Sequence, residues 1–149
     1  MSNSPTLSPI RVMIVDDHLM VRDGLRTFLS LYDDLEVVGE ASDGQEAVIL
    51  CSQVPTDVIL MDVVMSGVDG PTATARIREE HPHIQIIALS TFSEQELVQR
   101  AIQAGAVGYL LKDVHADKLA EAIRDAYHGH STLDAAAAQA LVQAATKPP

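Results

Sequence analysis

The sequence predicts one α/β domain in which helices cover both faces of a sheet of parallel strands. Apolar runs of four to six residues alternate with longer segments whose apolar residues recur at helical spacing. The connections between these segments are short, which implies right-handed crossovers between parallel strands. Several runs are nearly all apolar, as expected for strands buried on both faces. The length of 149 residues suits one domain with its own core.

Five strands are predicted from the apolar runs. They lie at residues 10–15, 36–41, 57–62, 85–90 and 108–111. The second run is relatively polar, which indicates a place at the edge of the sheet. The core is expected to be aliphatic, because the chain has two Phe, three Tyr and no Trp.

Five helices are predicted to follow these strands. They lie at residues 18–31, 45–53, 71–81, 94–104 and 117–128. Pro71 suits the first turn of the third helix. Ser93 and Glu96 predict a capping box at the start of the fourth helix. Gly105 suits the position just beyond its end.

The two ends of the chain are expected to differ from this core. Residues 1–9 carry neither a basic start nor an apolar stretch, so we expect a disordered leader and no secretory signal. Residues 129–132 break the pattern, and Asp134 is placed to cap a helix that runs to about residue 145. The apolar stripe of this helix is too thin for stability alone, so it must pack on this domain or on a second copy.

Composition disfavours several classes of function. The formal net charge is −11 and the ten basic residues are scattered, which argues against a nonspecific nucleic-acid surface. Cys51 is the single cysteine, and its apolar neighbours indicate a buried, inert thiol. No apolar run approaches the ~20 residues needed to cross a bilayer. We therefore expect a cytoplasmic protein without membrane association.

Polar side chains stand at the carboxyl ends of four predicted strands. These residues are Asp16 and Asp17 after the first strand, Asp62 on the third, Ser90 on the fourth and Lys112 after the fifth. The carboxyl ends of parallel strands meet at one edge, where such sheets bind ligands. Any one of these residues alone would be an ordinary solvated strand end, but the complete ordered set indicates a function.

The chemistry of this set suits a cation and a phosphoryl group. Three neighbouring carboxylates repel one another unless a cation is present. Oxygen ligands with open coordination positions favour Mg2+, which binds through one or two carboxylates plus a phosphate. An Asp beside Mg2+ is able to attack phosphorus and form an acyl phosphate, while Lys112 and the metal neutralise charge on the transferring group.

Five segments of the chain carry a family pattern. They are VMIVDDH at 12–18, MD at 61–62, GVDG at 67–70, LS at 89–90 and GAVGYLLKD at 105–113. In this order they resemble a receiver domain of a bacterial two-component response regulator, over about residues 10–127. The resemblance implies a flavodoxin-like (βα)5 doubly wound fold with a five-stranded parallel sheet of order 2-1-3-4-5. The predicted helix near the C-terminus is then an additional linker helix.

The resemblance also implies a role for each residue of the acidic cluster. Asp62 is the phosphoacceptor. Asp17 and Asp62 bind Mg2+ directly, and Asp16 binds it through water. The main-chain carbonyl of Val64 is the third protein ligand.

The remaining roles concern phosphoryl transfer and switching. Lys112 is the partner of the phosphoryl group, Ser90 is the switch hydroxyl, and Tyr109 is the switch aromatic. The implied phosphodonor is a sensor histidine kinase. The domain is expected to phosphorylate itself from such a donor and to dephosphorylate itself, without turning over an external substrate.

Two details resemble the NarL/FixJ (LuxR-type) class, whose output is a helix-turn-helix DNA-binding domain. They are Asp-Asp-His at 16–18 and Lys-Asp at 112–113, where many other receivers have Lys-Pro. The implied organisation is a receiver domain at 10–128 and a linker helix at 129–149 toward an output domain absent from this chain. Homodimerisation on phosphorylation, and DNA binding only through that domain, are implied as well. The alternative is a stand-alone receiver that acts by protein–protein interaction.

Some positions depart from the family pattern or bear on rival functions. Leu19 and Ser66 stand where proline is common, so the loop after Asp62 is expected to be more mobile. Val64 borders the implied phosphoryl site, where we hypothesise that it obstructs water.

Two rival functions are disfavoured by the sequence. A haloacid-dehalogenase-type phosphohydrolase would need an Asp at position 64, which argues against this rival. A degenerate receiver that acts only as a binding module is disfavoured by the intact set of polar residues.

Overall fold

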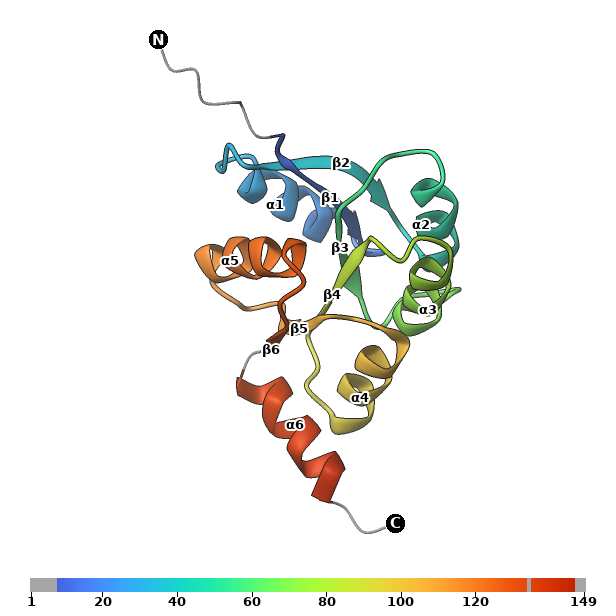
Figure 1. Ribbon diagram of the computed structural model, residues 1–149, viewed down its shortest axis with the longest axis vertical. Coiled ribbons are helices and arrows are strands. Elements are labelled where there is room, and N and C mark those ends of the chain that lie inside the picture. Colours follow the sequence, from blue (N-terminus) through green and yellow to red (C-terminus); the bar gives the residue numbers. More distant parts are fainter. Residues whose placement is uncertain (1–7, 134, 147–149) are drawn as a thin grey trace.

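The computed structural model describes residues 8–133 and 135–146, and its centre is a six-stranded parallel sheet of order β2-β1-β3-β4-β5-β6 (Figure 1). The strands are β1 (Ile10–Val15), β2 (Leu35–Ala41), β3 (Val58–Asp62), β4 (Gln85–Ser90), β5 (Gly108–Leu111) and β6 (Thr132–Leu133). The helices are α1 (Leu19–Leu29), α2 (Gly44–Cys51), α3 (Gly70–Glu80), α4 (Gln95–Ala104), α5 (Ala116–Tyr127) and α6 (Ala135–Thr146). The expected fold class is confirmed, including the order 2-1-3-4-5 and the edge position of β2.

Helices cover both faces of the sheet, with α1 and α5 on one side and α2 and α3 on the other (Figure 1). Alternate residues of β1 enter the two cores because successive side chains of a strand point to opposite faces. Val12 and Ile14 pack with Ile123 of α5, whereas Met13 packs with Ile77 of α3. Burial on both faces explains why the strand segments are so uniformly apolar.

A third core joins α4, β5 and α6. It contains Val98 of α4, Tyr109 of β5 and the small side chains of Ala137 and Ala140. The last helix therefore packs on this domain, which is one of the two partners expected for its thin apolar stripe. Small residues let α6 approach α4 closely.

The sheet has one strand more than expected, because Thr132 and Leu133 pair with Gly108 and Tyr109. Two residues are too few to show an apolar pattern, so β6 could not be predicted. A Cβ atom at Gly108 would lie 2.5 Å from the carbonyl oxygen of Thr132. The missing side chain of Gly108 is thus what allows β6 to approach β5.

Most helix boundaries follow the predicted signals, with one exception. Pro71 lies in the first turn of α3, and Gly105 ends α4 in the left-handed region with φ of 114°. The capping box predicted at Ser93 is wrong, because α4 is capped at Glu94 and no side chain there accepts a cap hydrogen bond. The preceding loop is held at Phe92 instead, by hydrogen bonds with the side chains of Ser90 and Tyr109.

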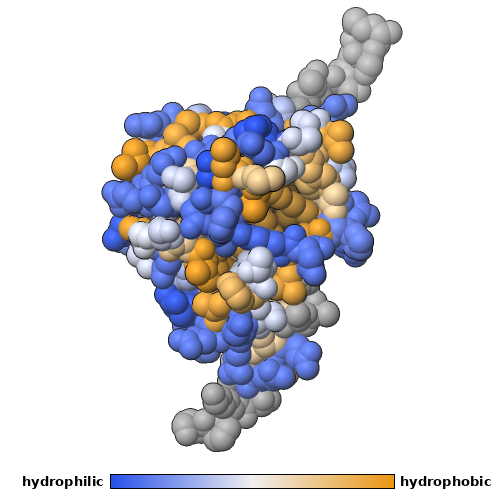
Figure 2. Space-filling view, turned by 180° about the vertical axis from the view of Figure 1, so that it is seen from behind, coloured by the Kyte–Doolittle hydropathy of each residue, from blue (hydrophilic) through white to orange (hydrophobic). Residues whose placement is uncertain are grey.

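The cysteine and the helices can be compared with the expectations from composition. Cys51 is buried, and burial raises the pKa of its thiol to about 11, in keeping with an inert side chain. None of the helices among residues 8–133 and 135–146 combines the length and apolar character that a bilayer crossing requires. Hydrophobic residues reach the surface near the middle of the face drawn in Figure 2, and hydrophilic residues surround them. Residues 1–7 of the expected leader and the expected cap at Asp134 lie outside the described residues.

Candidate functional site

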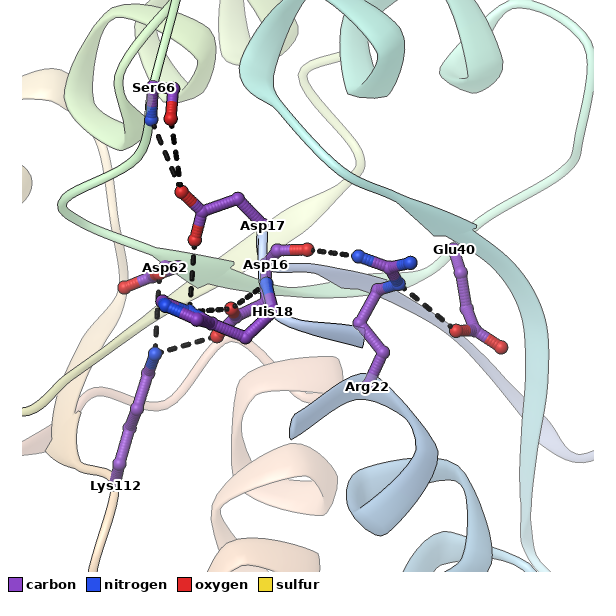
Figure 3. Close-up of polar contacts among 8 residues, drawn as sticks. All are labelled: Asp16, Asp17, His18, Arg22, Glu40, Asp62, Ser66 and Lys112. Carbon is purple, nitrogen blue, oxygen red and sulfur yellow. Dashed lines mark hydrogen bonds and ion pairs between the residues drawn. The ribbon is translucent and has the colours of Figure 1, made fainter. Parts of the chain in front are cut away.

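The carboxyl ends of β1, β3 and β5 bring the predicted acidic cluster together (Figure 3). The possible ligand atoms of four residues lie within 4.8 Å of one another: Asp16, Asp17, His18 and Asp62. Asp16 and Asp62 are 2% and 4% exposed, although both stand at strand ends. The predicted convergence of the three aspartates is therefore present in the fold.

Lys112 reaches the cluster from the end of β5. Its Nζ lies 2.6 Å from Oδ2 of Asp16 and 3.3 Å from Oδ2 of Asp62. Burial opposes its charged form, but the hydrogen bond to Asp16 and the charge of Asp62 together raise the pKa of Lys112 above its ordinary value. The side chain is thus a fixed positive charge between two carboxylates.

Asp62 is the carboxyl group with the most perturbed ionisation at this edge. Burial, followed by the negative charge of Asp16, raises the pKa of Asp62 to about 6, against the opposing effect of Lys112. A perturbed carboxyl with a specific charged partner is a feature of functional sites. A cation beside it would favour the ionised form and reverse the direction of this shift.

Asp16 is held by hydrogen bonds at every polar group. Its N–H donates to the carbonyl of Ala41 at 3.1 Å, and its carbonyl accepts from Arg22 at 2.6 Å. Oδ1 accepts from the N–H of His18 at 2.8 Å, and Oδ2 accepts from Lys112. Burial would raise the pKa of Asp16, but the bonds from Lys112 and His18 outweigh it and lower the value.

Asp17 is the carboxylate best suited to receive a cation. Its Oδ1 is buried and accepts no hydrogen bond from the described residues, although His18 Nδ1 lies 3.0 Å away as an ion-pair contact, while Oδ2 lies 3.3 Å from the N–H of Ser66. A buried carboxylate oxygen without a hydrogen-bond donor, close to Asp62, matches the hard oxygen donors that Mg2+ prefers. The donor set therefore fits Mg2+, and Asp17 and Asp62 are the side chains that would hold it. Asp16, whose oxygens are all engaged, suits contact through water.

Three neighbours of the cluster were not predicted as parts of the site. His18 places Nδ1 3.0 Å from Oδ1 of Asp16 and of Asp17, with its side chain 67% exposed. Ser66 contacts Asp17, and Arg22 contacts the main chain of Asp16. Adjacency to the Asp doublet was a signal for His18, but the other two contacts arise only from tertiary structure.

The predicted switch residues meet at the main chain of Phe92. Ser90 is buried, and its Oγ accepts from the N–H of Phe92 at 3.0 Å. Tyr109 is fully buried and donates its hydroxyl to the carbonyl of Phe92 at 2.6 Å. One peptide segment before α4 therefore links the end of β4 to the start of β5. Val64 lies in the loop after β3 with its side chain half-exposed.

Comparisons with known proteins agree with this arrangement. A model of the response regulator receiver domain matches residues 12–124. The chain belongs to the response regulator receiver domain family. Among its relatives, the transcriptional regulatory protein LiaR of Bacillus subtilis is 49% identical over 125 residues, which cover 84% of this receiver and 59% of LiaR. This receiver thus spans less than two thirds of that relative.

Two solved structures show the same fold and class. A LuxR-family two-component response regulator from Aurantimonas superposes with a TM-score of 0.86 at 30% identity, over 94% of this receiver and 100% of that chain. The signal receiver domain of the putative response regulator NarL from Mycobacterium tuberculosis has a TM-score of 0.78 at 35% identity, over 83% and 100% of the two chains. The resemblance to the NarL/FixJ (LuxR-type) class is thereby confirmed.

Proposed function

We propose that Asp62 of this receiver accepts a phosphoryl group from the phosphohistidine of a sensor histidine kinase, with Mg2+ bound beside it. The observation that supports this most directly is the environment of the Asp62 carboxylate. It is almost fully buried, it lies 3.3 Å from the Lys112 ammonium, and it shares a cluster with Asp17, whose Oδ1 is contacted by His18 but accepts no hydrogen bond from the described residues. An acidic strand end with a purely structural role would not need this combination of burial and charge.

The proposed transfer is a displacement at phosphorus. A carboxylate oxygen of Asp62 forms a bond to phosphorus as the N–P bond of the phosphohistidine breaks, and the bonding electron pair stays on the imidazole nitrogen. Mg2+ neutralises charge on the transferring group when bound, and Asp17, Asp62 and the carbonyl of Val64 are proposed to hold it. Lys112 supplies a second positive charge from the side of β5. The product is an aspartyl phosphate, so the domain does not turn over an external substrate.

The same geometry supports a switch at Ser90 and Tyr109. The hydroxyl of Ser90 accepts a bond from Phe92, which leaves its own hydrogen free to donate to a phosphoryl oxygen on Asp62. A phosphoryl group adds close to two negative charges. Ser90 and Lys112 are therefore drawn toward it, and the segment bonded to Tyr109 moves with Ser90.

We propose that this switch controls homodimerisation and, through it, transcription. The relationship to LiaR, whose name is that of a transcriptional regulatory protein, supports an output domain that binds DNA beyond residues 10–128 and a connector at 129–149. Family membership also supports action in the cytoplasm. A stand-alone receiver that acts by protein–protein interaction is the second candidate, because α6 packs on α4 within this domain.

Phosphorylation by a small-molecule donor tests the proposal. The protein is incubated with acetyl phosphate, with and without Mg2+, and its intact mass is measured. We expect a gain of one phosphoryl group that needs Mg2+, persists in Asp113→Asn, and is lost in Asp62→Asn. Asp113 is an exposed carboxylate next to Lys112, which makes it a matched control. Steady release of inorganic phosphate without a stable mass gain would indicate a hydrolase, and absence of any reaction would indicate a binding module.

A further inference from the structure

An ion pair beside the acidic cluster is not explained by the chemistry described above. Arg22 of α1 donates from Nη1 to the carbonyl oxygen of Asp16 at 2.6 Å and from Nε to Oε1 of Glu40 of β2 at 3.3 Å (Figure 3). The two side chains are only 15% and 23% exposed. The guanidinium therefore joins the ends of β1 and β2 to the first helix.

The acceptor of this bond is the peptide group that precedes Asp17. Because the carbonyl of Asp16, the N–H of Asp17 and the Cα of Asp17 belong to one planar unit, fixing that carbonyl fixes the position of the Cα from which the Asp17 side chain leaves the main chain. The N–H of Asp16 is held as well, by the carbonyl of Ala41, the residue after Glu40. The β1–α1 turn is thus tied to the edge strand on both sides of Asp16.

We propose that Arg22, oriented by Glu40, is a positioning residue for the cation site. It holds the Asp16–Asp17 peptide so that the carboxylate of Asp17 stays beside Asp62. This inference rests on the proposed function, since it concerns the same cation. The planar fork of arginine bonds a carbonyl and a carboxylate in fixed directions, which a single ammonium does not. Groups that orient metal ligands are worth about 10- to 100-fold in metal affinity in other proteins.

The neighbouring Arg26 provides a control on the same helix. It pairs with the same Glu40 and with Asp23. Within the described part of the chain, these ion pairs do not include a member of the acidic cluster. Half-exposed pairs of this kind contribute little to folding or function. If Arg22 acted only as a surface ion pair, its loss and that of Arg26 would have the same small effect.

Titration of Mg2+ alone, followed by isothermal calorimetry, tests the inference on the whole chain. We expect Arg22→Gln to raise the Kd for Mg2+ about tenfold and Arg26→Gln to leave it within about twofold. Arg22→Lys should be intermediate, because its ammonium bonds Asp16 or Glu40 but not both. Glu40→Gln should weaken binding in the same direction as Arg22→Gln. The phosphorylation rate of Arg22→Gln should return to the wild-type maximum at saturating Mg2+, which a general loss of structure would not allow.

Two results would overturn the inference. One is an unchanged Kd in both Arg22→Gln and Glu40→Gln, and the other is an equal loss in Arg22→Gln and Arg26→Gln. Should Arg22→Gln fail to fold, Arg22→Lys and Glu40→Gln carry the test, since the first keeps the positive charge and the second keeps the length of the side chain. Failure of the wild-type chain to bind Mg2+ would instead refute the proposed function itself.

Discussion

The pKa values of two aspartates at the same edge of the sheet are shifted in opposite directions. Asp16 and Asp62 are both nearly inaccessible, yet the pKa of Asp16 is lowered and that of Asp62 is raised. Burial favours the neutral form of both. Lys112 decides the outcome, because it lies 2.6 Å from Asp16 but 3.3 Å from Asp62, and the main chain of His18 adds a second donor to Asp16. Asp16 therefore remains ionised over a wide pH range, whereas Asp62 changes its protonation state near pH 6.

The raised pKa of Asp62 predicts a pH-dependent stability. Its folded value of about 6 exceeds the ordinary value of 3.8, so between these values the folded state binds more protons than the unfolded state. Stability is therefore lost as pH rises through this window, and Asp62→Asn removes that loss. In Mg2+-free buffer, the advantage of the variant should grow by on the order of 2 kcal/mol from about pH 4.5 to about pH 7.5. Urea unfolding measures it, and a pH-independent difference would contradict this account.

The side chain of Val64 is expected to lengthen the lifetime of the phosphorylated form. Val64 is 50% exposed in the loop that follows Asp62, and we hypothesise that its branched apolar side chain obstructs water at the phosphoryl site. Val64→Ala should shorten the half-life of the aspartyl phosphate several-fold, as followed by intact mass over time. Ile49→Ala, which trims a similarly exposed side chain on α2, should leave the half-life unchanged. An unchanged half-life in Val64→Ala would refute the hypothesis.

At the scale of elements, the most accurate predictions concern strands whose apolar residues are followed by a polar residue. The bounds predicted for β1, β4 and β5 match the structure, because an apolar run, interrupted in β1 only by Arg11, meets a polar residue at its carboxyl end. The failures have a common cause. The two-residue β6 and the absent capping box before α4 depend on contacts between distant parts of the chain. The expected packing of α6 on this domain is observed.

The pairing of β6 gives a prediction for Gly108. A methyl group there would meet the Thr132 carbonyl at 2.5 Å, and main-chain atoms cannot move aside easily. Gly108→Ala should therefore release β6 and expose α6 to faster amide hydrogen exchange, while β1 and β3 stay protected. Gly24→Ala is the control, since a methyl group in α1 meets nothing within 4 Å and should stabilise the protein by about 0.5–1 kcal/mol. Unchanged exchange of α6 in Gly108→Ala would contradict this role of the glycine.

At the scale of the whole molecule, a short series of contacts connects the strand end at Ser90 with the C-terminal helix. Ser90 and Tyr109 both form hydrogen bonds with the main chain of Phe92, and Tyr109 lies in the same core as Ala137 of α6. The convergence of the aspartates could be predicted because parallel strands end at one edge. The contacts from Arg22 and Ser66 could not, since nothing in the local sequence marks them.

Cation binding should stabilise the entire fold by mass action. Binding to the folded state alone contributes about 2.7 kcal/mol when free Mg2+ is 100 times Kd. We therefore expect Mg2+ to raise the Tm of the wild-type chain and chelation to reverse the rise. Asp17→Asn, which removes the negative charge of a proposed Mg2+ ligand, should abolish the response. An equal rise in this variant would show that the ion binds elsewhere.

The most direct test of the central claim is to locate the phosphoryl group on the chain. Borohydride converts an aspartyl phosphate to homoserine, and peptide mass spectrometry then identifies the residue. After treatment with acetyl phosphate and Mg2+, the account predicts homoserine at position 62. Homoserine at 16 or 17, with Asp62 unmodified, would contradict it.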